Sequence, residues 1–393
     1  MSWLVAGALA AGCGPHSIPV PAPRTATSDA PSCLIVADSA GTPRPVTAVF
    51  ADSADAERAR RTDSLEPPVR LDCEGRALPA LATTWSRDSS GRFWTIQLDS
   101  PSDGTDGPRW TAAAALAAAW RAGAAASEAL RLSGVESLLP LDEHRLVVEF
   151  SAPRAELPPL FADPALGVPR ARPRPTTLDA RAPGGDPRDA LEGGADLVVS
   201  DDPALLDYAG RRPGFTRVPL PWSRGYVLLL PVGSSLGAAV PPDTAAFRAG
   251  LARDAVRVDA RPAEPPFWWD AAGGCVRPPA PAGVRRSSAV VYPEGDASAA
   301  GLAERLVALA GAEGLAARGL SAGRLVAALR TGSERAYVLP VPSHALVPCR
   351  AVADWPAGAT AVGLVETREH AVIRHGTPPL VVGWDGTLRA PAP

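Results

Sequence analysis

Apolar residues follow two different spacings along the chain, and each spacing predicts one kind of element. Short apolar or alternating runs that end at Gly, Pro, Asp or Ser are typical of β-strands. Such runs occupy residues 33–37, 46–50, 67–75, 81–85, 93–98, 145–150, 196–200, 215–219, 225–230, 289–292, 336–341, 371–374 and 380–382. We expect the last two runs to form a strand pair.

Helices are predicted where apolar residues recur every three or four positions. Four segments have this spacing, marked by Leu116 with Trp120, Phe247 with Leu251, Leu302 with Leu306 and Leu309, and Leu325 with Leu329. Between residues 289 and 341 a strand, two helices and a strand follow one another, which is typical of a βαβ-like unit. The sequence therefore predicts a mixed fold, α/β or α+β.

The first 13 residues have the pattern of an export signal. Residues 3–11 are apolar, which is too short a run to span a bilayer, where about 20 residues are needed, but suits a signal peptide. The run from Leu9 to Cys13 resembles the cleavage box of bacterial lipoproteins, in which the cysteine carries the lipid. We expect residues 1–13 to be a lipoprotein signal, with Cys13 as the anchor, and the Pro- and Ser-rich residues 14–32 to be a tether. An ordinary buried cysteine is the alternative.

The cysteine count agrees with an oxidising compartment. Without Cys13, four cysteines remain, and an even number in an exported protein indicates two disulfides. We favour Cys33–Cys73 and Cys275–Cys349, because each pair then lies within one region of the chain; four unpaired thiols are the alternative. The five histidines form no cluster with cysteines, so no metal site is predicted.

Charge and composition exclude several functions. The chain has 393 residues, which predicts two or three domains, and its 42 acidic and 39 basic side chains give no overall charge for binding nucleic acid. It contains no lysine, which excludes a Schiff-base lysine and a Walker-type phosphate loop. No cofactor motif is present. The motif Gly233–Gly237 fits Gly-x-Ser-x-Gly around Ser235, but no helix is predicted directly after it, so a serine hydrolase is a distant alternative and we expect no enzyme.

One stretch resembles a known family. Residues 79–120 resemble the diagnostic segment of the bacterial extracellular solute-binding proteins of family 5, which serve dipeptide and oligopeptide ABC importers. The matching positions are Pro79, Leu81, Ala82, Trp85, Asp106-Gly107 and Thr111-Ala112. Further segments keep the order of the family, namely 66–72, 135–150, 189–200, 217–230 and 247–256, so the resemblance covers residues 33–260 and, more weakly, 285–393.

The resemblance implies a two-lobed periplasmic-binding-protein fold with a discontinuous first lobe. It places residues 33–231 and 356–393 in the first lobe, with 71–165 as a subdomain, and residues 232–355 in a shortened second lobe. It also implies a monomer that closes on a short peptide or another small polar solute and delivers it to an ABC permease. The expected location is the periplasm or the cell surface.

Six residues are candidates for the ligand pocket. Trp222, Arg224 and Tyr226 lie on or beside the expected cleft-edge strand, where an arginine can bind a carboxylate and aromatic rings can line a pocket. Trp268, Trp269 and Asp270 lie in an irregular loop, where two rings and a carboxylate could hold an amine. Packing of these side chains in the core or at the surface is the alternative for each.

The second lobe lacks the long helical and Asn-rich segments that normally carry ligand residues in this family. No ligand residue is therefore transferred from the family. This departure leaves a second hypothesis open, in which the chain keeps the fold but acts as a scaffold or partner-binding lipoprotein of the cell envelope.

Overall fold

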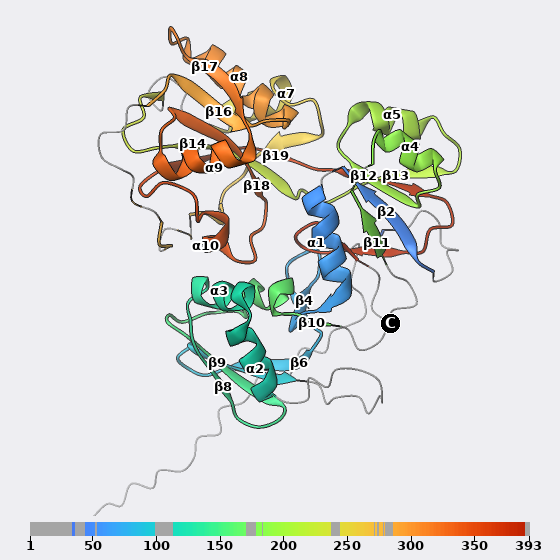
Figure 1. The fold of residues 1–393 in the computed structure, drawn as a ribbon, viewed down its shortest axis with the longest axis vertical. Helices are drawn as coiled ribbons and strands as arrows, with labels where there is room; N and C mark the ends of the chain where they lie inside the picture. Colours follow the sequence, from blue (N-terminus) through green and yellow to red (C-terminus); the bar gives the residue numbers. More distant parts are fainter. Residues whose placement is uncertain are drawn as a thin grey trace, which may run out of the picture.

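Three larger β-sheets, each with its own hydrophobic core, organise the chain (Figure 1). The structure is a computed structural model. It describes residues 34–35, 44–51, 53–98, 113–169, 178–182, 184–236, 244–270, 272, 275–277, 279 and 286–389. Cys13, Cys33, Asp106, Gly107, Thr111 and Ala112 lie outside these residues, so the anchor and the Cys33–Cys73 pairing stay predictions.

The first lobe is built on a five-stranded sheet. In spatial order its strands are β11 (Leu178–Arg181), β2 (Val46–Phe50), β12 (Leu197–Ser200), β20 (His370–Arg374) and β13 (Phe215–Pro219). Strands β11 and β12 run parallel to β2, whereas β20 runs antiparallel to both of its neighbours. The nearly unbroken apolar sequence of β12 fits a strand that is covered on both faces.

Different elements cover the two faces of this sheet. On one face lie α1 (Ser53–Ser64) and the small sheet of β1 (Leu34–Ile35), β21 (Leu380–Val382) and β22 (Leu388–Arg389). On the other face lie α4 (Pro187–Glu192) and α5 (Pro203–Gly210). The expected pairing of the last two strands is wrong, because β20 joins the large sheet while β21 pairs with β1 and β22.

The subdomain is an antiparallel sheet packed against two helices. Its strands, in spatial order, are β6 (Ala82–Arg87), β7 (Phe93–Leu98), β9 (Arg145–Phe150) and β8 (Val135–Pro140), and its helices are α2 (Ala113–Ala122) and α3 (Ala124–Leu132). Leu116 and Trp120 are buried on one face of α2, as their spacing predicts. The indole of Trp120 donates a hydrogen bond to the carbonyl of Leu166.

Short elements join the subdomain to the first lobe. They are β3 (Leu65–Glu66) with β10 (Val168–Pro169), β4 (Val69–Leu71) with β5 (Ala77–Pro79), and the 3-10 helices η1 (Pro159–Ala162) and η2 (Pro164–Leu166).

The second lobe has a six-stranded mixed sheet. In spatial order its strands are β15 (Ala260–Pro262), β19 (Thr360–Thr367), β14 (Arg224–Leu230), β18 (Ala336–Pro342), β16 (Ala289–Pro293) and β17 (Ala316–Leu320). Helices α7 (Ala245–Asp254) and α8 (Ala297–Ala310) pack on one face, and α9 (Ala322–Thr331) packs on the other. The βαβ unit is confirmed, because β16 runs parallel to both β17 and β18.

The sheets place the boundary of the second lobe differently from the sequence prediction. Strands β14 and β19 are interior strands of this six-stranded sheet, whereas the bounds of 232–355 expected from the sequence leave both strands in the first lobe. The apolar runs predict these strands but not their partners, because strands of similar composition fit either sheet.

Two short segments connect the lobes, and they lie side by side. The chain passes from β13 to β14 through residues 220–223 and returns from β19 to β20 through residues 368–369. The amide of Leu220 donates to the carbonyl of Glu369 across the two segments, at 2.9 Å. On either side of this bond, Pro219 pairs with His370 and Arg224 pairs with Thr367. The junction is therefore a narrow two-stranded ribbon.

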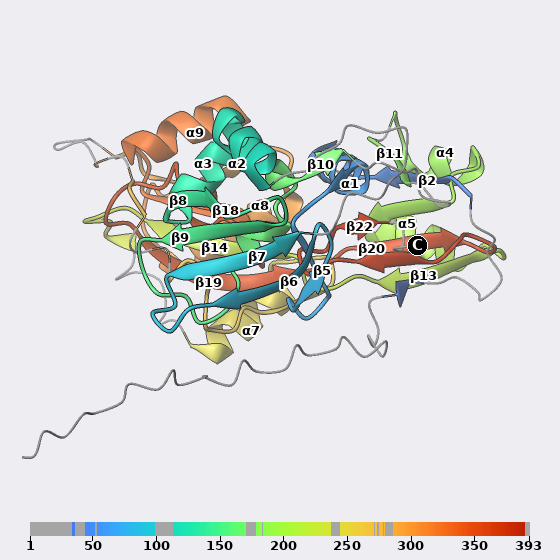
Figure 2. The same cartoon turned by 90° about the horizontal axis from the view of Figure 1, so that it is seen from below.

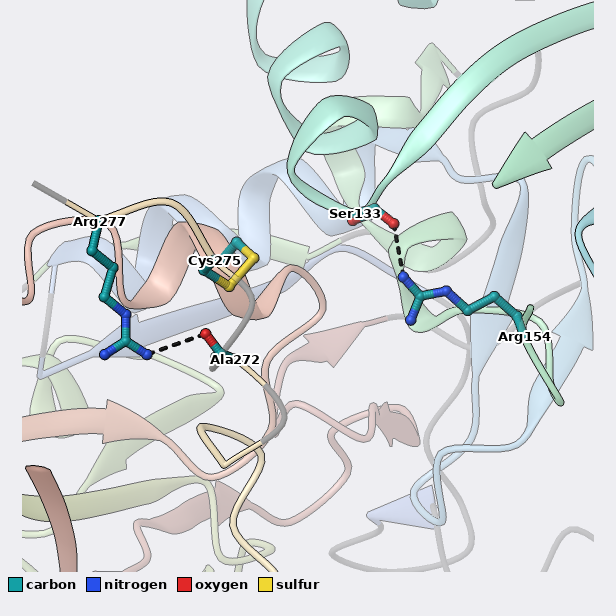
Figure 3. The surroundings of a disulfide bond; sticks show 6 residues. Ser133, Arg154, Ala272, Cys275 and Arg277 are labelled. Atoms are coloured by element: carbon teal, nitrogen blue, oxygen red, sulfur yellow. Dashed lines mark hydrogen bonds between the residues drawn. A yellow bond between two sulfur atoms is a disulfide. The ribbon is translucent and has the colours of Figure 1, made fainter. Parts of the chain in front are cut away.

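A second contact joins the lobes away from this ribbon, through the loop between β18 and β19. Val347 is buried in the core of the subdomain, and Arg350, in α10 (Pro348–Ala351), forms an ion pair with Asp163 at 2.8 Å. Cys349 is bonded to Cys275, the pairing that the sequence favours. Figure 3 shows this disulfide beside Arg277, which donates a hydrogen bond to the carbonyl of Ala272. The same view includes Ser133 of the subdomain, whose carbonyl accepts a hydrogen bond from Arg154. We call residues 343–352 the clasp.

Close packing of α7 against α8 gives a test of this arrangement. A Cβ atom added to Gly301 of α8 would lie 2.2 Å from the carbonyl oxygen of Ala255, which follows α7. We expect Gly301→Ala to lower the free energy of unfolding by about 1–3 kcal/mol. A Cβ on Gly250, within α7, meets nothing within 4 Å, so Gly250→Ala is the control and should raise stability by about 0.5–1 kcal/mol. Urea unfolding measures both, and equal effects of the two variants would contradict this packing.

Candidate functional site

A large cleft lies between the two lobes. Its volume is about 1300 Å³, and its lining comes from both lobes and from the connecting segments. The first lobe contributes the ends of β2 and β12 and the starts of α1 and α5, and the second lobe contributes the end of β16 and the start of α8. Ligands of open α/β sheets bind beyond the carboxyl ends of the strands, and this cleft occupies that position in both lobes.

Local sequence determines where each helix at the cleft begins. Asp202 accepts a hydrogen bond from the amide of Ala204 at the start of α5, and Asp296 accepts one from Ala299 at the start of α8. Such side chains satisfy amide groups of the first helical turn that have no partner within the helix. In α5 a proline directly follows this cap, where its fixed φ suits the first helical position.

Arg224 lies at the centre of a cluster of charged side chains in the cleft. It opens β14, and its guanidinium lies 3.3 Å from the carboxylate of Asp55, in the first turn of α1. Burial by itself lowers the pKa of Arg224, but Tyr226, Glu369, Asp55 and Asp201 raise it, and the net shift is upward. A second-lobe side chain is thus held as a cation by carboxylates of the first lobe and of the connecting segment.

Tyr226 continues this cluster into the second lobe. It is 1% exposed, and its hydroxyl donates to Asp296 at 3.1 Å. Burial and the charge of Asp296 raise the pKa of the phenol, so the hydroxyl keeps its proton and remains a donor. Tyr226 and Arg224 lie two residues apart on β14 and point to the same face of the sheet.

Asp201 follows β12 and lines the first-lobe side of the cleft. The pKa of its carboxyl is raised, mainly because the group is buried. The positive charge of Arg224 opposes this shift, and the negative charges of Asp296 and Asp202 add to it. Within the described residues, no side chain donates a hydrogen bond to this carboxylate. The carboxylates of Asp202, Asp296 and Asp385, by contrast, accept hydrogen bonds from neighbouring backbone or hydroxyl groups.

The six predicted pocket residues divide into two groups. Arg224 and Tyr226 line the cleft, and the other four do not. Trp222 is stacked between the guanidinium groups of Arg261 and Arg368, at 4.8 and 4.6 Å from the ring centre. Arg261 belongs to β15 of the second lobe and Arg368 to the connecting segment, so the ring of Trp222 packs beside the junction of the lobes.

The Trp-rich loop packs on the far face of the second-lobe sheet. Trp269 is buried there against Phe267, with ring centres 4.4 Å apart, and the indole of Trp268 donates to the carbonyl of Pro342. Asp270 is exposed at the end of this loop. The two indole rings thus pack within the second lobe, and Asp270 lies at its surface. Ser235 is also exposed and lies outside the cleft lining.

Sequence reasoning missed the acidic side chains that line the cleft. Asp55, Asp201 and Asp296 stand directly after, or within a few residues of, strands that were predicted. Their position in the sequence could have predicted this, because an acidic residue just past the carboxyl end of a parallel strand faces the ligand crevice.

The described residues contain neither a metal-binding cluster nor a membrane-spanning helix. No group of three or more His, Cys, Asp or Glu side chains there could hold a metal ion. None of the helices in that part of the chain has the length and apolar composition needed to cross a membrane.

Comparison with known proteins identifies the fold. No family model and no curated protein matches the sequence. Among solved structures, an oligopeptide-binding protein (OppAIV) from Borrelia burgdorferi matches at 11% identity with a TM-score of 0.55, covering 84% of this chain and 95% of that one. The DppA binding protein from Helicobacter pylori, in complex with the peptide STSA, matches at 9% identity and 0.55, covering 89% and 98%.

A third structure shows that the fold serves different ligands. NikZ from Campylobacter jejuni, in complex with Ni(L-His), matches at 12% identity with a TM-score of 0.54, covering 88% of this chain and 97% of that one. The chain therefore has the two-lobed fold of these periplasmic binding proteins, as the sequence resemblance implies. At such low sequence identity the similarity indicates the fold but not the ligand. The ligand has to be inferred from the residues of the cleft.

The charged centre of the cleft can be tested by removing its cation. Arg224→Met keeps the length of the side chain but leaves Asp55, Glu369 and Asp201 without their shared partner. We expect a loss of about 2 kcal/mol in the free energy of unfolding, below the ~3–5 kcal/mol of a fully buried pair, because the arginine side chain keeps 30% exposure.

Arg217→Met is the matched control for this variant. Arg217 is exposed on β13, the strand that precedes β14 in the chain. Removing its guanidinium should therefore change the free energy of unfolding by less than about 0.5 kcal/mol. Chemical unfolding of both variants gives the comparison. A loss for Arg224→Met no larger than that of the control would show that the cluster does not hold the lobes.

Proposed function

We propose that the chain is a solute-binding protein of an ABC import system, which captures a small solute by closing its two lobes around the cleft. The observation that carries the proposal is the cleft itself, whose lining is shared between two lobes joined by a narrow ribbon. Its volume of about 1300 Å³ exceeds the ~300–1,000 Å³ typical of small-molecule pockets, so it has room for a short peptide.

The ribbon supplies the mechanism of capture. Two lobes connected by a few extended residues can rotate about them, and a solute that contacts both lobes binds the closed form more tightly than the open form. Lining residues from both sides are present, since Asp201 belongs to the first lobe and Asp296 belongs to the second. Binding energy is thereby converted into a change of shape that a membrane permease can recognise.

The fold neighbours support this proposal by what they bind, since one is in complex with a peptide and another with a nickel complex of histidine. Export fits the cysteine pattern and the disulfide between Cys275 and Cys349. We propose that Cys13 carries a lipid anchor and that residues 14–32 tether the binding lobes to the membrane. The protein would act as a monomer and without catalysis.

Native mass spectrometry tests for a captured solute. The full chain is exported into an oxidising compartment and purified without denaturant, so that a tightly bound solute is retained. We expect an added mass of small-molecule size that disappears when the protein is denatured. Adding the identified solute at about 100 times its dissociation constant should then stabilise the fold by roughly 2.7 kcal/mol.

A protein of bare mass, with no thermal shift across panels of short peptides and metal complexes, would contradict solute capture. That result would favour the scaffold hypothesis, in which the cleft or the clasp binds another protein of the envelope.

A further inference from the structure

The clasp reaches out of the second lobe and contacts the subdomain. Val347 is 5% exposed and is buried in the hydrophobic core of the subdomain. Arg350 forms an ion pair with Asp163 at 2.8 Å and donates a hydrogen bond to the carbonyl of Ala125, in α3, at 3.2 Å. A buried apolar side chain stabilises this contact, and the charge-assisted hydrogen bond fixes its orientation.

The clasp also contacts the first lobe, through two stacked rings. The ring of His344 lies on the indole of Trp384, in the turn between β21 and β22, with ring centres 4.2 Å apart and planes 17° apart. Trp384 packs in turn against Gly75, between β4 and β5, since a Cβ atom added to Gly75 would lie 2.8 Å from the indole nitrogen. A first-lobe tryptophan is therefore enclosed between the clasp and the elements that join the subdomain to the first lobe.

The loop that carries Trp268 and Cys275 supports the clasp at both of its ends. Where the clasp begins, the indole of Trp268 donates to the carbonyl of Pro342 at 2.8 Å. Where it ends, Cys275 is bonded to Cys349, the residue next to Arg350 (Figure 3). A covalent link between two loops restricts the positions that either loop can take. The loop thereby keeps the end of the clasp in position to reach the subdomain.

The ribbon and the clasp are two separate contacts of the second lobe with the rest of the chain. At the ribbon, the amide of Leu220 donates to the carbonyl of Glu369 at 2.9 Å. The subdomain, which receives the clasp, is itself fastened to the first lobe, because Arg389 of β22 donates to the carbonyl of Leu71 in β4 at 3.1 Å. A rigid body that is held at two points keeps one rotation, the turn about the line through those points. Hinge motions of this kind are absorbed by a few residues at the pivots.

Resting on the proposed function, we infer that the clasp is a second pivot for closure of the cleft, so that the second lobe turns about the line from the ribbon to the clasp. The disulfide between Cys275 and Cys349 keeps this pivot assembled. The cleft then opens and closes along one path, and its two sides meet in the same register each time. Restricting the lobes to one path lowers the entropy that closure costs, which favours tight capture.

Distances between spin labels, measured by double electron–electron resonance on the full chain dialysed free of solute, test the pivot. The labels are attached to a keto-bearing unnatural amino acid, which leaves the cysteines unchanged. The cleft pair of labels replaces Asp207 of α5 and Ala308 of α8, and the clasp pair replaces Glu128 of α3 and Ala353, which follows the clasp; all four residues are exposed. We expect the distance distribution of the cleft pair to be at least about 2-fold wider than that of the clasp pair, because displacement in a rotation grows with distance from the axis.

Arg350→Met is the decisive variant, because it removes the ion pair with Asp163 and keeps the disulfide. It should widen the distribution of the clasp pair at least about 2-fold and speed hydrogen exchange at the amide of Val352, which is bonded within the clasp, by about 5- to 30-fold. Arg318→Met is the matched control. Arg318 pairs, also at 2.8 Å, with the similarly buried Glu334 inside the second lobe. This control should leave both measurements unchanged.

A second variant tests the covalent link. Replacing both cysteines, Cys275→Ser with Cys349→Ser, removes the link without leaving a free thiol. It should widen the distribution of the clasp pair as Arg350→Met does. Thermal unfolding shows whether this double variant still folds, and Arg350→Met, which retains the link, decides the question if it does not.

The outcomes separate this inference from the proposed function. Equal widths for the two label pairs in the natural chain, or a clasp pair that neither variant widens, overturn the pivot while solute capture stands. The absence of any co-purified or added solute that binds contradicts the proposed function, whereas the distances measured without solute still decide whether the clasp is a pivot.

Discussion

The junction of the two lobes depends on one partly buried cation. Arg224 stands at the first position of β14, and carboxylates from α1 and from the connecting segment surround it. A guanidinium in this place is stable only while those carboxylates remain, because an unpaired buried charge is strongly unfavourable. The same pairing therefore ties the start of the second lobe to α1 of the first.

The rest of the cleft follows from strand direction. The carboxyl ends of β2, β12 and β16 lie at the cleft, so the helices that follow these strands begin there and bring their capping residues with them (Figure 1). Away from the ribbon, Val347 and Arg350 of the clasp contact the subdomain, whose sheet of β6, β7, β9 and β8 is seen in Figure 2. The disulfide of Cys349 with Cys275 holds the clasp within the second lobe. Opening of the cleft is thus restrained from two sides, which favours a small rotation of the lobes over free separation.

Much of the fold could be predicted from the sequence, because long apolar periods report directly on buried faces. The βαβ unit from β16 to β18 and the strands at β6 and β7 are confirmed. Helix α1 was missed because only Ala56 and Ala59 of its described residues are buried, and ion pairs between its own side chains cover the rest. The apolar pattern of such a helix is too weak to be recognised.

The candidate site was harder to predict than the fold, because its residues meet only after the chain has crossed between the lobes twice. Arg224 and Tyr226 were found through their strand, whereas Asp201 and Asp296 are 95 positions apart in the sequence and come to line the same cleft only in the folded chain. The sequence predicts that Trp268 and Trp269 line a ligand pocket, whereas in the structure they pack on the far face of the second-lobe sheet. Composition alone does not separate a ring that packs from a ring that binds.

Small-angle X-ray scattering tests the central claim, closure of the cleft on a solute, most directly. The radius of gyration is measured with increasing concentrations of the solute that co-purifies with the chain. We expect a saturable decrease, with its midpoint at the dissociation constant that calorimetry gives for the same solute. A radius that stays constant although calorimetry shows the cleft to be occupied would contradict it, because the solute would then bind without moving the lobes.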